Sequence, residues 1–261
     1  LTALKTLLNT YTNHNTMQLV EVIPNISHAT LAFSMQIAHN SNCRIMTVTI
    51  MNRLIRKLLE TLEHPVFSVG DIQNIEPDAG VRYNLVKRAM KAGDLIQIKR
   101  GLYTLHPSLR RRPINRASLA NRLYYPSYVS MEYALSSHGW IPESVTMLTS
   151  ATSKNPADFD TPLGRFSYKR IPQTLFFCGV EVVSIDGESA LLARPLKALA
   201  DYVYAHKLEW TSREPLVESL RIEEDELATL TKDDFEAIQG NYRTAPAVEN
   251  FLAGLRRDLK L

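Results

Sequence analysis

Residues 52–105 show an ordered succession of helix and strand signals, and this succession constrains the fold more than any other feature. An amphipathic helix is predicted over 52–63, because apolar residues recur at three- and four-residue spacing at Leu54, Ile55, Leu58, Leu59 and Leu62. His64-Pro65 ends that helix, since the residue before a proline disfavours the helical region. Phe67 then begins a short extended stretch. Ser68, with Asp71 three residues later, predicts a capped short helix through Ile75.

A basic helix and a hairpin complete the succession. After a turn at 76–80, a helix is predicted over 81–92, with a buried face of Val81, Leu85, Val86, Ala89 and Met90. Gly93 stands where a left-handed C-cap is expected. Two short apolar runs then flank Lys99-Arg100-Gly101 and predict a β-hairpin. This order of elements is that of a winged helix-turn-helix, which we expect over 51–106.

The predicted helix over 81–92 carries the candidate DNA-contacting residues. Arg82, Tyr83 and Asn84 lie in its first turns, where a helix docked in the major groove reads base edges. Lys87, Arg88 and Lys91 follow at positions suited to phosphate contacts. Lys99 and Arg100, at the hairpin tip, are expected to reach an adjacent groove or the backbone. The competing interpretation is a protein-binding module with a solvated basic face.

The distribution of charge supports a polyanionic partner for this region. Residues 51–124 hold 14 Lys and Arg against 6 Asp and Glu, a net charge of +8, whereas residues 125–261 hold 14 against 20, a net charge of −6. A basic segment beside an acidic one indicates that only the first faces nucleic acid. An unevenly charged, solvated surface is the alternative.

The rest of the chain predicts a second domain, so the expected fold class is α+β: a winged helix followed by a mixed domain with a helical C-terminal part. Residues 107–124 form a basic link, with a short helix near 118–124. The domain then spans 125–261, with a helix over 130–138 capped by Ser130. Strands are expected over 145–152, 165–171, 175–177 and 180–185, followed by helical sequence after Gly187 and further helices near 195–204, 213–220, 232–239 and 245–260.

Residues 1–50 differ from the remainder. They are rich in Asn, Thr, Ser and His, carry few charges and show no sustained period. Met51 directly precedes the first patterned segment, so we expect translation to start there and 1–50 to be a spurious extension. A genuine N-terminal arm without fixed structure is the alternative.

Signals for catalysis are weak, and we expect no enzyme, no cofactor and no metal. The sequence has no phosphate-binding glycine loop and no metalloprotease motif, and its two cysteines, Cys43 and Cys178, are too few for a disulfide scaffold or a structural zinc site. No apolar run is long enough to span a membrane, so a cytoplasmic protein is expected. His138 and Asp201 are interpreted as a helix-end side chain and a surface or salt-bridge residue. A nuclease-like site would need clustered carboxylates and a lysine, for which the nearest set is Glu181, Asp186, Glu188 and Lys197.

Several blocks of the chain, taken in order, resemble a known family. Residues 128–143 (Tyr-Val-Ser-Met-Glu-Tyr-Ala-Leu-Ser-Ser-His-Gly-Trp-Ile-Pro-Glu) resemble the opening of the C-terminal domain of the AbiEi antitoxins of type IV toxin–antitoxin systems. Residues 159–168 and 192–204 resemble later blocks, and Arg100-Gly-Leu-Tyr103 resembles the family's N-terminal module. The resemblance runs from about Met51 to the C-terminus, and residues 1–50 have no counterpart. The family often has Glu where this chain has Leu196, so this chain lacks that carboxylate.

The resemblance implies two linked roles in abortive infection, a form of phage defence. The N-terminal domain would repress its own operon by binding operator DNA, with a homodimer on DNA as one arrangement. The C-terminal domain would counteract a nucleotidyltransferase-like toxin, a functional relation that needs no direct contact. The alternative function is a stand-alone winged-helix transcription factor whose second domain senses a ligand or dimerises.

Overall fold

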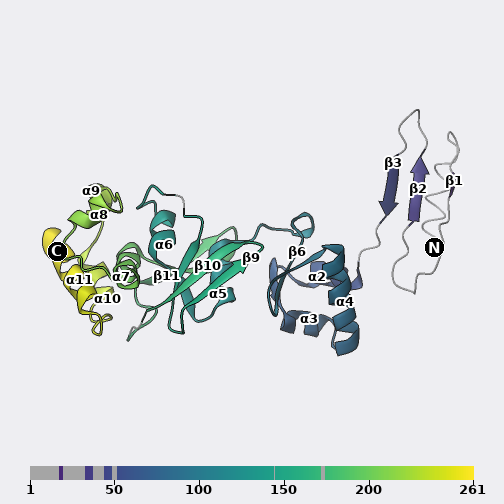
Figure 1. Ribbon diagram of the computed structural model, residues 1–261, viewed down its shortest axis with the longest axis horizontal. Coiled ribbons are helices and arrows are strands. Elements are labelled where there is room, and N and C mark those ends of the chain that lie inside the picture. Colours follow the sequence, from purple (N-terminus) through teal and green to yellow (C-terminus); the bar gives the residue numbers. More distant parts are fainter. Residues whose placement is uncertain (1–17, 20–32, 38–43, 49–51, 144, 172–173) are drawn as a thin grey trace. The chain divides into compact units, whose positions relative to one another are not determined.

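The computed structural model describes residues 18–19, 33–37, 44–48, 52–143, 145–171 and 174–261 (Figure 1). Contacts divide the chain into two compact units, 1–60 and 61–261. Both contain helices and strands, so the fold is of the mixed α+β class, as expected. No described helix combines the length and the apolar character needed to cross a bilayer.

The first unit contains a small antiparallel sheet and most of one helix. Its strands pair in the order β1-β2-β3, with bounds Gln18–Leu19, Phe33–Ile37 and Arg44–Val48. We expected no strand pattern in this segment, yet Phe33, Met35 and Ile37 alternate with polar residues, which is the period of a strand. The other residues of 1–50, for which we expected a spurious extension or an arm without fixed structure, lie outside the described residues. The helix α2 (Arg53–Thr61) follows, with Leu54, Ile55 and Leu58 buried.

The second unit begins with a three-stranded antiparallel sheet and two helices. The strands β4 (Val66–Ser68), β6 (Leu102–Leu105) and β5 (Leu95–Lys99) pair in the order β4-β6-β5. Between β4 and β5 lie α3 (Val69–Ile75) and α4 (Ala79–Ala92). The backbone of Gly101, in the β5–β6 turn, has φ +83° and accepts a 3.0 Å hydrogen bond from Val69 N–H at the start of α3. The turn of the hairpin is therefore tied to the first residue of α3.

The basic helix begins two residues earlier than predicted. The side chain of Asp78 accepts a 2.7 Å hydrogen bond from Val81 N–H and acts as the N-cap. Ala79 and Gly80, which we expected in the preceding turn, thus belong to the first turn of α4. The C-terminal prediction is confirmed, because Gly93 caps α4 with a left-handed φ of 79°.

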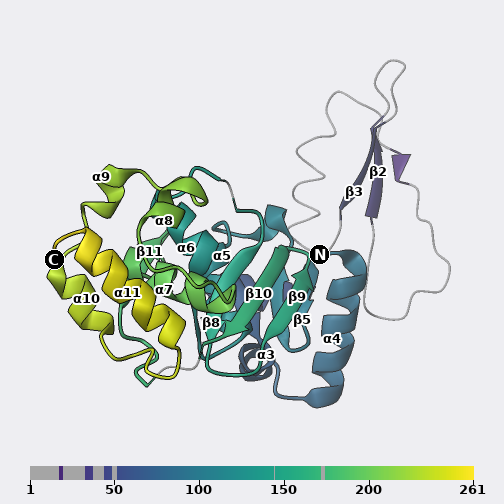
Figure 2. The ribbon, with the colours of Figure 1, turned by 60° about the vertical axis from the view of Figure 1, so that its left-hand side comes forward.

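A six-stranded mixed sheet forms the centre of the second unit (Figures 1 and 2). Its strand order is β11-β12-β7-β8-β10-β9, with parallel pairing at β12–β7 and β8–β10 and antiparallel pairing elsewhere. The strands are Ser127–Val129 (β7), Leu148–Thr152 (β8), Ala157–Thr161 (β9), Gly164–Arg170 (β10), Val180–Ile185 (β11) and Glu188–Ala193 (β12).

Helices cover both faces of this sheet. Tyr128 and Val129 are neighbours on β7 and therefore point to opposite faces. The Tyr128 hydroxyl donates to Asp201 on α7 (Pro195–Ala205). Val129, Ser150 and Tyr168 are in register on adjacent strands, so their side chains point to the same face. On that face the Tyr168 hydroxyl donates to the carbonyl of Ala120 on α5 (Arg116–Leu123). The helices α5 and α7 thus lie on opposite faces.

The remaining helices complete the unit. A 3-10 turn, η1 (Pro107–Leu109), precedes α5, and α6 (Met131–Ser137) lies against α7. At the C-terminal end, α7 also packs against α10 (Lys232–Ile238) and α11 (Pro246–Asp258), while α8 (Glu214–Glu218) and α9 (Glu224–Leu227) are short. Residues 116–123, expected in a basic linker, instead pack on the sheet, with Ala117, Leu119, Ala120 and Leu123 buried.

The strand predictions were wrong at four places. Two strands, β7 and β9, lie where we expected none. Residues 188–193 form β12, although we expected helical sequence after Gly187. Their sequence Glu-Ser-Ala-Leu-Leu-Ala favours a helix by intrinsic preference, but pairing with both β11 and β7 overrides it. Residues 175–177 form a turn, not the expected strand.

Candidate nucleic-acid interface

The basic helix α4 is held at both ends by local hydrogen bonds. Upstream of it, Ser68 and Asp71 form the capping box that the sequence predicted for α3, with reciprocal bonds between side chains and backbone. Asp78 and Gly93 cap α4 itself. These caps fix the ends of a 14-residue helix whose position against α3 and β5 is set by packing.

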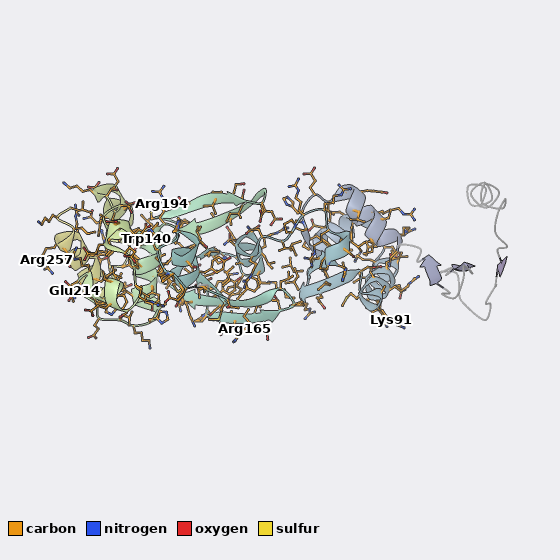
Figure 3. All side chains as sticks on the ribbon, turned by 90° about the horizontal axis from the view of Figure 1, so that it is seen from above. Lys91, Trp140, Arg165, Arg194, Glu214 and Arg257 are labelled. Atoms are coloured by element: carbon orange, nitrogen blue, oxygen red, sulfur yellow. The ribbon has the colours of Figure 1, made fainter. Side chains whose placement is uncertain are left out.

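The outer surface of α4 is exposed and basic. Five of the predicted contact residues are exposed on it: Tyr83, Asn84, Lys87, Arg88 and Lys91. The Tyr83 side chain is 65% exposed, and the Lys87 ammonium group lies 5.8 Å from the centre of its ring. Figure 3 labels Lys91 in the last turn of the helix. Residues 79–92 contain four Lys and Arg and no acidic residue, so the helix presents positive charge alone.

Arg82 is held differently from its neighbours. Its Nη1 group donates to the backbone carbonyls of Glu76 (2.9 Å) and Pro77 (2.8 Å), in the turn between α3 and α4. A guanidinium has five N–H donors, so Nε and Nη2 can still face a further acceptor. Because α4 begins at Ala79, Arg82 is the fourth residue of the helix. The predicted start at Val81 had made it the second.

The two residues predicted at the hairpin tip have different surroundings. Arg100 is exposed in the turn. Lys99, in contrast, donates from Nζ to the carbonyl of Leu123, the last residue of α5, and lies 5.4 Å from the centre of the Phe159 ring. Burial and the nearby charge of Lys154 lower the pKa of Lys99. The Lys99 side chain thus contacts α5 and β9.

The buried face of α4 includes fewer residues than the sequence predicted. Ala89 is buried and Leu85 and Val86 are half-buried, as expected for residues facing the sheet. Val81 and Met90 were wrongly assigned to the core, because they are 42% and 39% exposed. With the helix starting at Ala79, Val81 lies in the first turn, where few neighbours cover it.

A buried polar cluster lies far along the chain from α4, and the sequence did not lead us to expect it. Asp201, predicted as a surface or salt-bridge residue, is fully buried and lies 3.5 Å from Lys197, so the salt-bridge alternative is confirmed and the surface position is wrong. Its carboxylate accepts hydrogen bonds from Tyr128 (2.8 Å), Ser130 (2.7 Å) and Tyr242 (2.5 Å). Lys197 lies one helical turn earlier on α7 and donates to the Tyr242 hydroxyl (2.8 Å). Ser130, which we expected to cap α6, makes this bond in place of a cap.

The burial of this cluster has a signal in the sequence. In 195–205 the only charged residues are Lys197 and Asp201, spaced by four residues among apolar ones. A helix that is apolar nearly all round is buried, so its charged pair is buried with it. Gly179 (φ +71°) passes close to the pair: an added Cβ there would lie 3.1 Å from Lys197 Cβ and 2.7 Å from Ile238 Cγ2.

The residues that a nuclease-like site would need are not brought together. Glu181 lies 3.7 Å from Arg194, and Lys197 pairs with Asp201. Asp186 lies in the turn of the β11–β12 hairpin and Glu188 begins β12, at the end of the hairpin opposite to Lys197. Among the described residues, no group of three or more His, Cys, Asp and Glu side chains is placed to hold a metal ion. His138 ends α6, and its Nε2 lies 2.9 Å from the carbonyl of Ala193.

No protein-family model matches the chain, and no curated protein matches it.

Proposed function

We propose that residues 52–105 form a winged helix-turn-helix and that α4 is its recognition helix for double-stranded DNA. The elements α2, α3 and α4 followed by the β5–β6 hairpin have the order of this motif, with β4 as the third strand of the small sheet. The observation that carries the proposal is the outer surface of α4, which combines exposed Lys and Arg side chains with no acidic residue.

Different residues of α4 suit different parts of a DNA site. Asn84 and the remaining donors of Arg82 suit base edges, because amide and guanidinium groups pair in bidentate fashion with adenine and guanine. Lys87, Arg88 and Lys91 suit phosphates, which hold the helix in place without reading sequence. Tyr83 and the exposed Arg100 supply further contacts.

We further propose that the protein is a cytoplasmic autorepressor and antitoxin of the AbiEi type, without enzymatic activity of its own. The support is the resemblance of residues 128–143, 159–168 and 192–204 to that family. The segment 125–261 has a net charge of −6, which suits a role other than holding DNA. Its task would be to counteract a nucleotidyltransferase-like toxin.

Two measurements test the proposal. In the first, binding of the full chain to the DNA upstream of its own gene is compared with binding to random DNA over a range of salt concentrations. We expect tighter binding to the upstream DNA and a steep salt dependence on both. Equal affinity for both DNAs would contradict sequence-specific repression.

The second measurement concerns the toxin. Cells expressing a nucleotidyltransferase-like protein encoded beside this gene are expected to grow only when the full chain is co-expressed. Absence of such a gene, or growth arrest despite co-expression, would contradict the antitoxin role and leave DNA-binding regulation alone.

A further inference from the structure

An arginine-rich pocket lies where the chain passes from the β5–β6 hairpin to α5. Its volume is about 550 Å³, and its lining includes Arg110, Arg111, Arg112 and Arg116 together with the apolar side chains of Ile114 and Leu163. None of the described residues that line the pocket carries a carboxylate. Residues 107–116 hold four arginines and no acidic residue, so the pocket has a charge of +4 before any ligand is bound.

Two of the arginines are anchored at the pocket by backbone carbonyls. Arg110 donates from Nε to the carbonyl of Leu105 (2.7 Å), at the end of β6. Arg116 donates from Nη2 to the carbonyl of Thr146 (2.7 Å), and its guanidinium lies 5.8 Å from the centre of the Phe166 ring. Gly164 leaves room for this arrangement, because an added Cβ would come within 3.0 Å of Arg116 Nη2.

Each anchored guanidinium retains a buried donor without a partner. Arg110 Nη2 and Arg116 Nε are buried and have no hydrogen-bond partner among the described residues. A buried unpaired donor is costly, and more so when it carries charge. Within the described part of the chain, none of the four arginines forms an ion pair with a carboxylate. An anionic ligand would offset the mutual repulsion of the four charges.

The chemistry of the lining selects a class of anion. Guanidinium groups present planar pairs of donors that match the oxygens of a phosphate, and several of them together suit a ligand with more than one negative charge. Pro107 and Pro113 flank the run Arg110-Arg111-Arg112 and restrict its backbone, which lowers the entropy lost on binding.

We propose that this pocket is a phosphate-binding site. Its ligand is a phosphate group of a phosphoester, supplied either by a free polyphosphorylated molecule such as a nucleoside triphosphate or by the DNA backbone. The site is distinct from α4 and does not require that α4 bind DNA.

The first experimental arm uses sodium tripolyphosphate and the full chain, by isothermal titration calorimetry at constant ionic strength and without DNA. We expect saturable binding of one tripolyphosphate per chain. The double variant Arg111→Gln/Arg112→Gln should weaken it at least tenfold, as should Arg116→Gln. Arg111 and Arg112 are exposed, so their substitution leaves the core intact, and the melting temperature verifies this. The matched control is Arg122→Gln, an arginine on α5 outside the pocket, which should leave the affinity unchanged.

The second arm distinguishes the two sources of phosphate. If the DNA backbone supplies it, tripolyphosphate binds weakly, and the double variant lowers the slope of log K against log salt for random DNA by about 0.9 per lost contact. If a free phosphoester supplies it, that slope is unchanged and the tripolyphosphate affinity alone falls. The proposal is overturned if the variants change neither quantity. Variants of Lys87 and Arg88 should leave tripolyphosphate binding intact, so failure of DNA recognition by α4 is separable from failure of the pocket.

Discussion

The ammonium group of Lys197 lies 3.5 Å from a carboxylate oxygen of Asp201, and both side chains are fully buried. The two residues are four apart on α7, and the hydroxyls of Tyr128, Ser130 and Tyr242 donate hydrogen bonds to the carboxylate. Burial lowers the pKa of Lys197, and the adjacent charge of Asp201 opposes that shift. The pair therefore joins α7 to β7 and to the segment between α10 and α11.

Asp201→Ala should destabilise the protein severely, because it leaves a charged amine and three hydroxyls buried without their shared acceptor. Loss of one partner of a buried pair costs about 3–5 kcal/mol. Urea denaturation followed by far-UV circular dichroism measures the free energy of unfolding. The control Asp225→Ala removes an exposed carboxylate and should change that energy by less than about 0.5 kcal/mol. Similar losses in both variants would contradict a structural role for the pair.

Stability should fall at alkaline pH. Burial raises the pKa of Tyr242 well above its ordinary 10.0, with the charge of Asp201 as a second cause, and burial also raises the pKa of Tyr168. Above pH 10 the unfolded chain releases phenolic protons that the folded chain keeps, so the stabilisation is complete below that pH and is lost as the pH rises. Denaturation midpoints at pH 9 and pH 11.5 measure the loss, and Tyr168→Phe should reduce it. A midpoint that does not change with pH would refute the assignment.

Lys87→Ala and Arg88→Ala should weaken binding to operator and random DNA alike. Each removes one exposed cation of α4, so the slope of log K against log salt should fall by roughly 0.9 per lost phosphate contact. Fluorescence anisotropy at several salt concentrations gives the slope. Lys232→Ala, which removes an exposed lysine of α10, is the control and should not alter it. Unchanged slopes in both α4 variants would exclude these residues from the interface.

Arg82→Lys should relax sequence preference more than affinity. Lysine keeps the charge, but it cannot hold the carbonyls of Glu76 and Pro77 while presenting a planar pair of donors to a guanine. The expected loss is about 1–3 kcal/mol of discrimination at one base position. Affinities for an operator and its single-base variants measure it. An identical preference at every position would assign Arg82 to the turn alone.

Lys99→Met should lower stability, whereas Arg100→Ala should lower DNA affinity. The first removes the donor to the Leu123 carbonyl at the end of α5, which should lower the free energy of unfolding by about 1 kcal/mol and leave DNA affinity unchanged. The second removes an exposed cation and should weaken DNA binding without loss of stability. Thermal unfolding and anisotropy on the same samples separate the two. Weaker DNA binding by a fully stable Lys99→Met protein would return Lys99 to the interface.

Local signals predicted local structure well. Four features appear where short-range chemistry indicated: the capping box of Ser68 and Asp71, the left-handed cap at Gly93, the hairpin around Gly101 and the helix near 232–239. Each depends on residues within a few positions of one another. The start of α4 was misplaced because Asp78 serves equally well in a turn or as an N-cap.

Structural features that depend on residues far apart in the sequence could not be predicted from local sequence signals. The strand β12 exists because β11 and β7 flank it, and the preference of its own residues is for a helix. The cluster around Asp201 joins residues that are 41 to 73 positions away. In the candidate interface, the exposed residues of α4 were found from the helical period, but the engagement of Lys99 by α5 depends on how the hairpin meets the sheet.

The hairpin and the six-stranded sheet share one core, since Val66, Ile98 and Leu102 belong to the same buried cluster as Leu119, Tyr128 and Phe166. Such a shared interior links ligand binding at one end to unfolding at the other. A ligand held by α4 at a hundred times its dissociation constant would add about 2.7 kcal/mol to the stability of the whole 61–261 unit. DNA bound to α4 would therefore slow proteolysis of the distant C-terminal helices. It would also slow those amide exchange events in the same helices that require global unfolding.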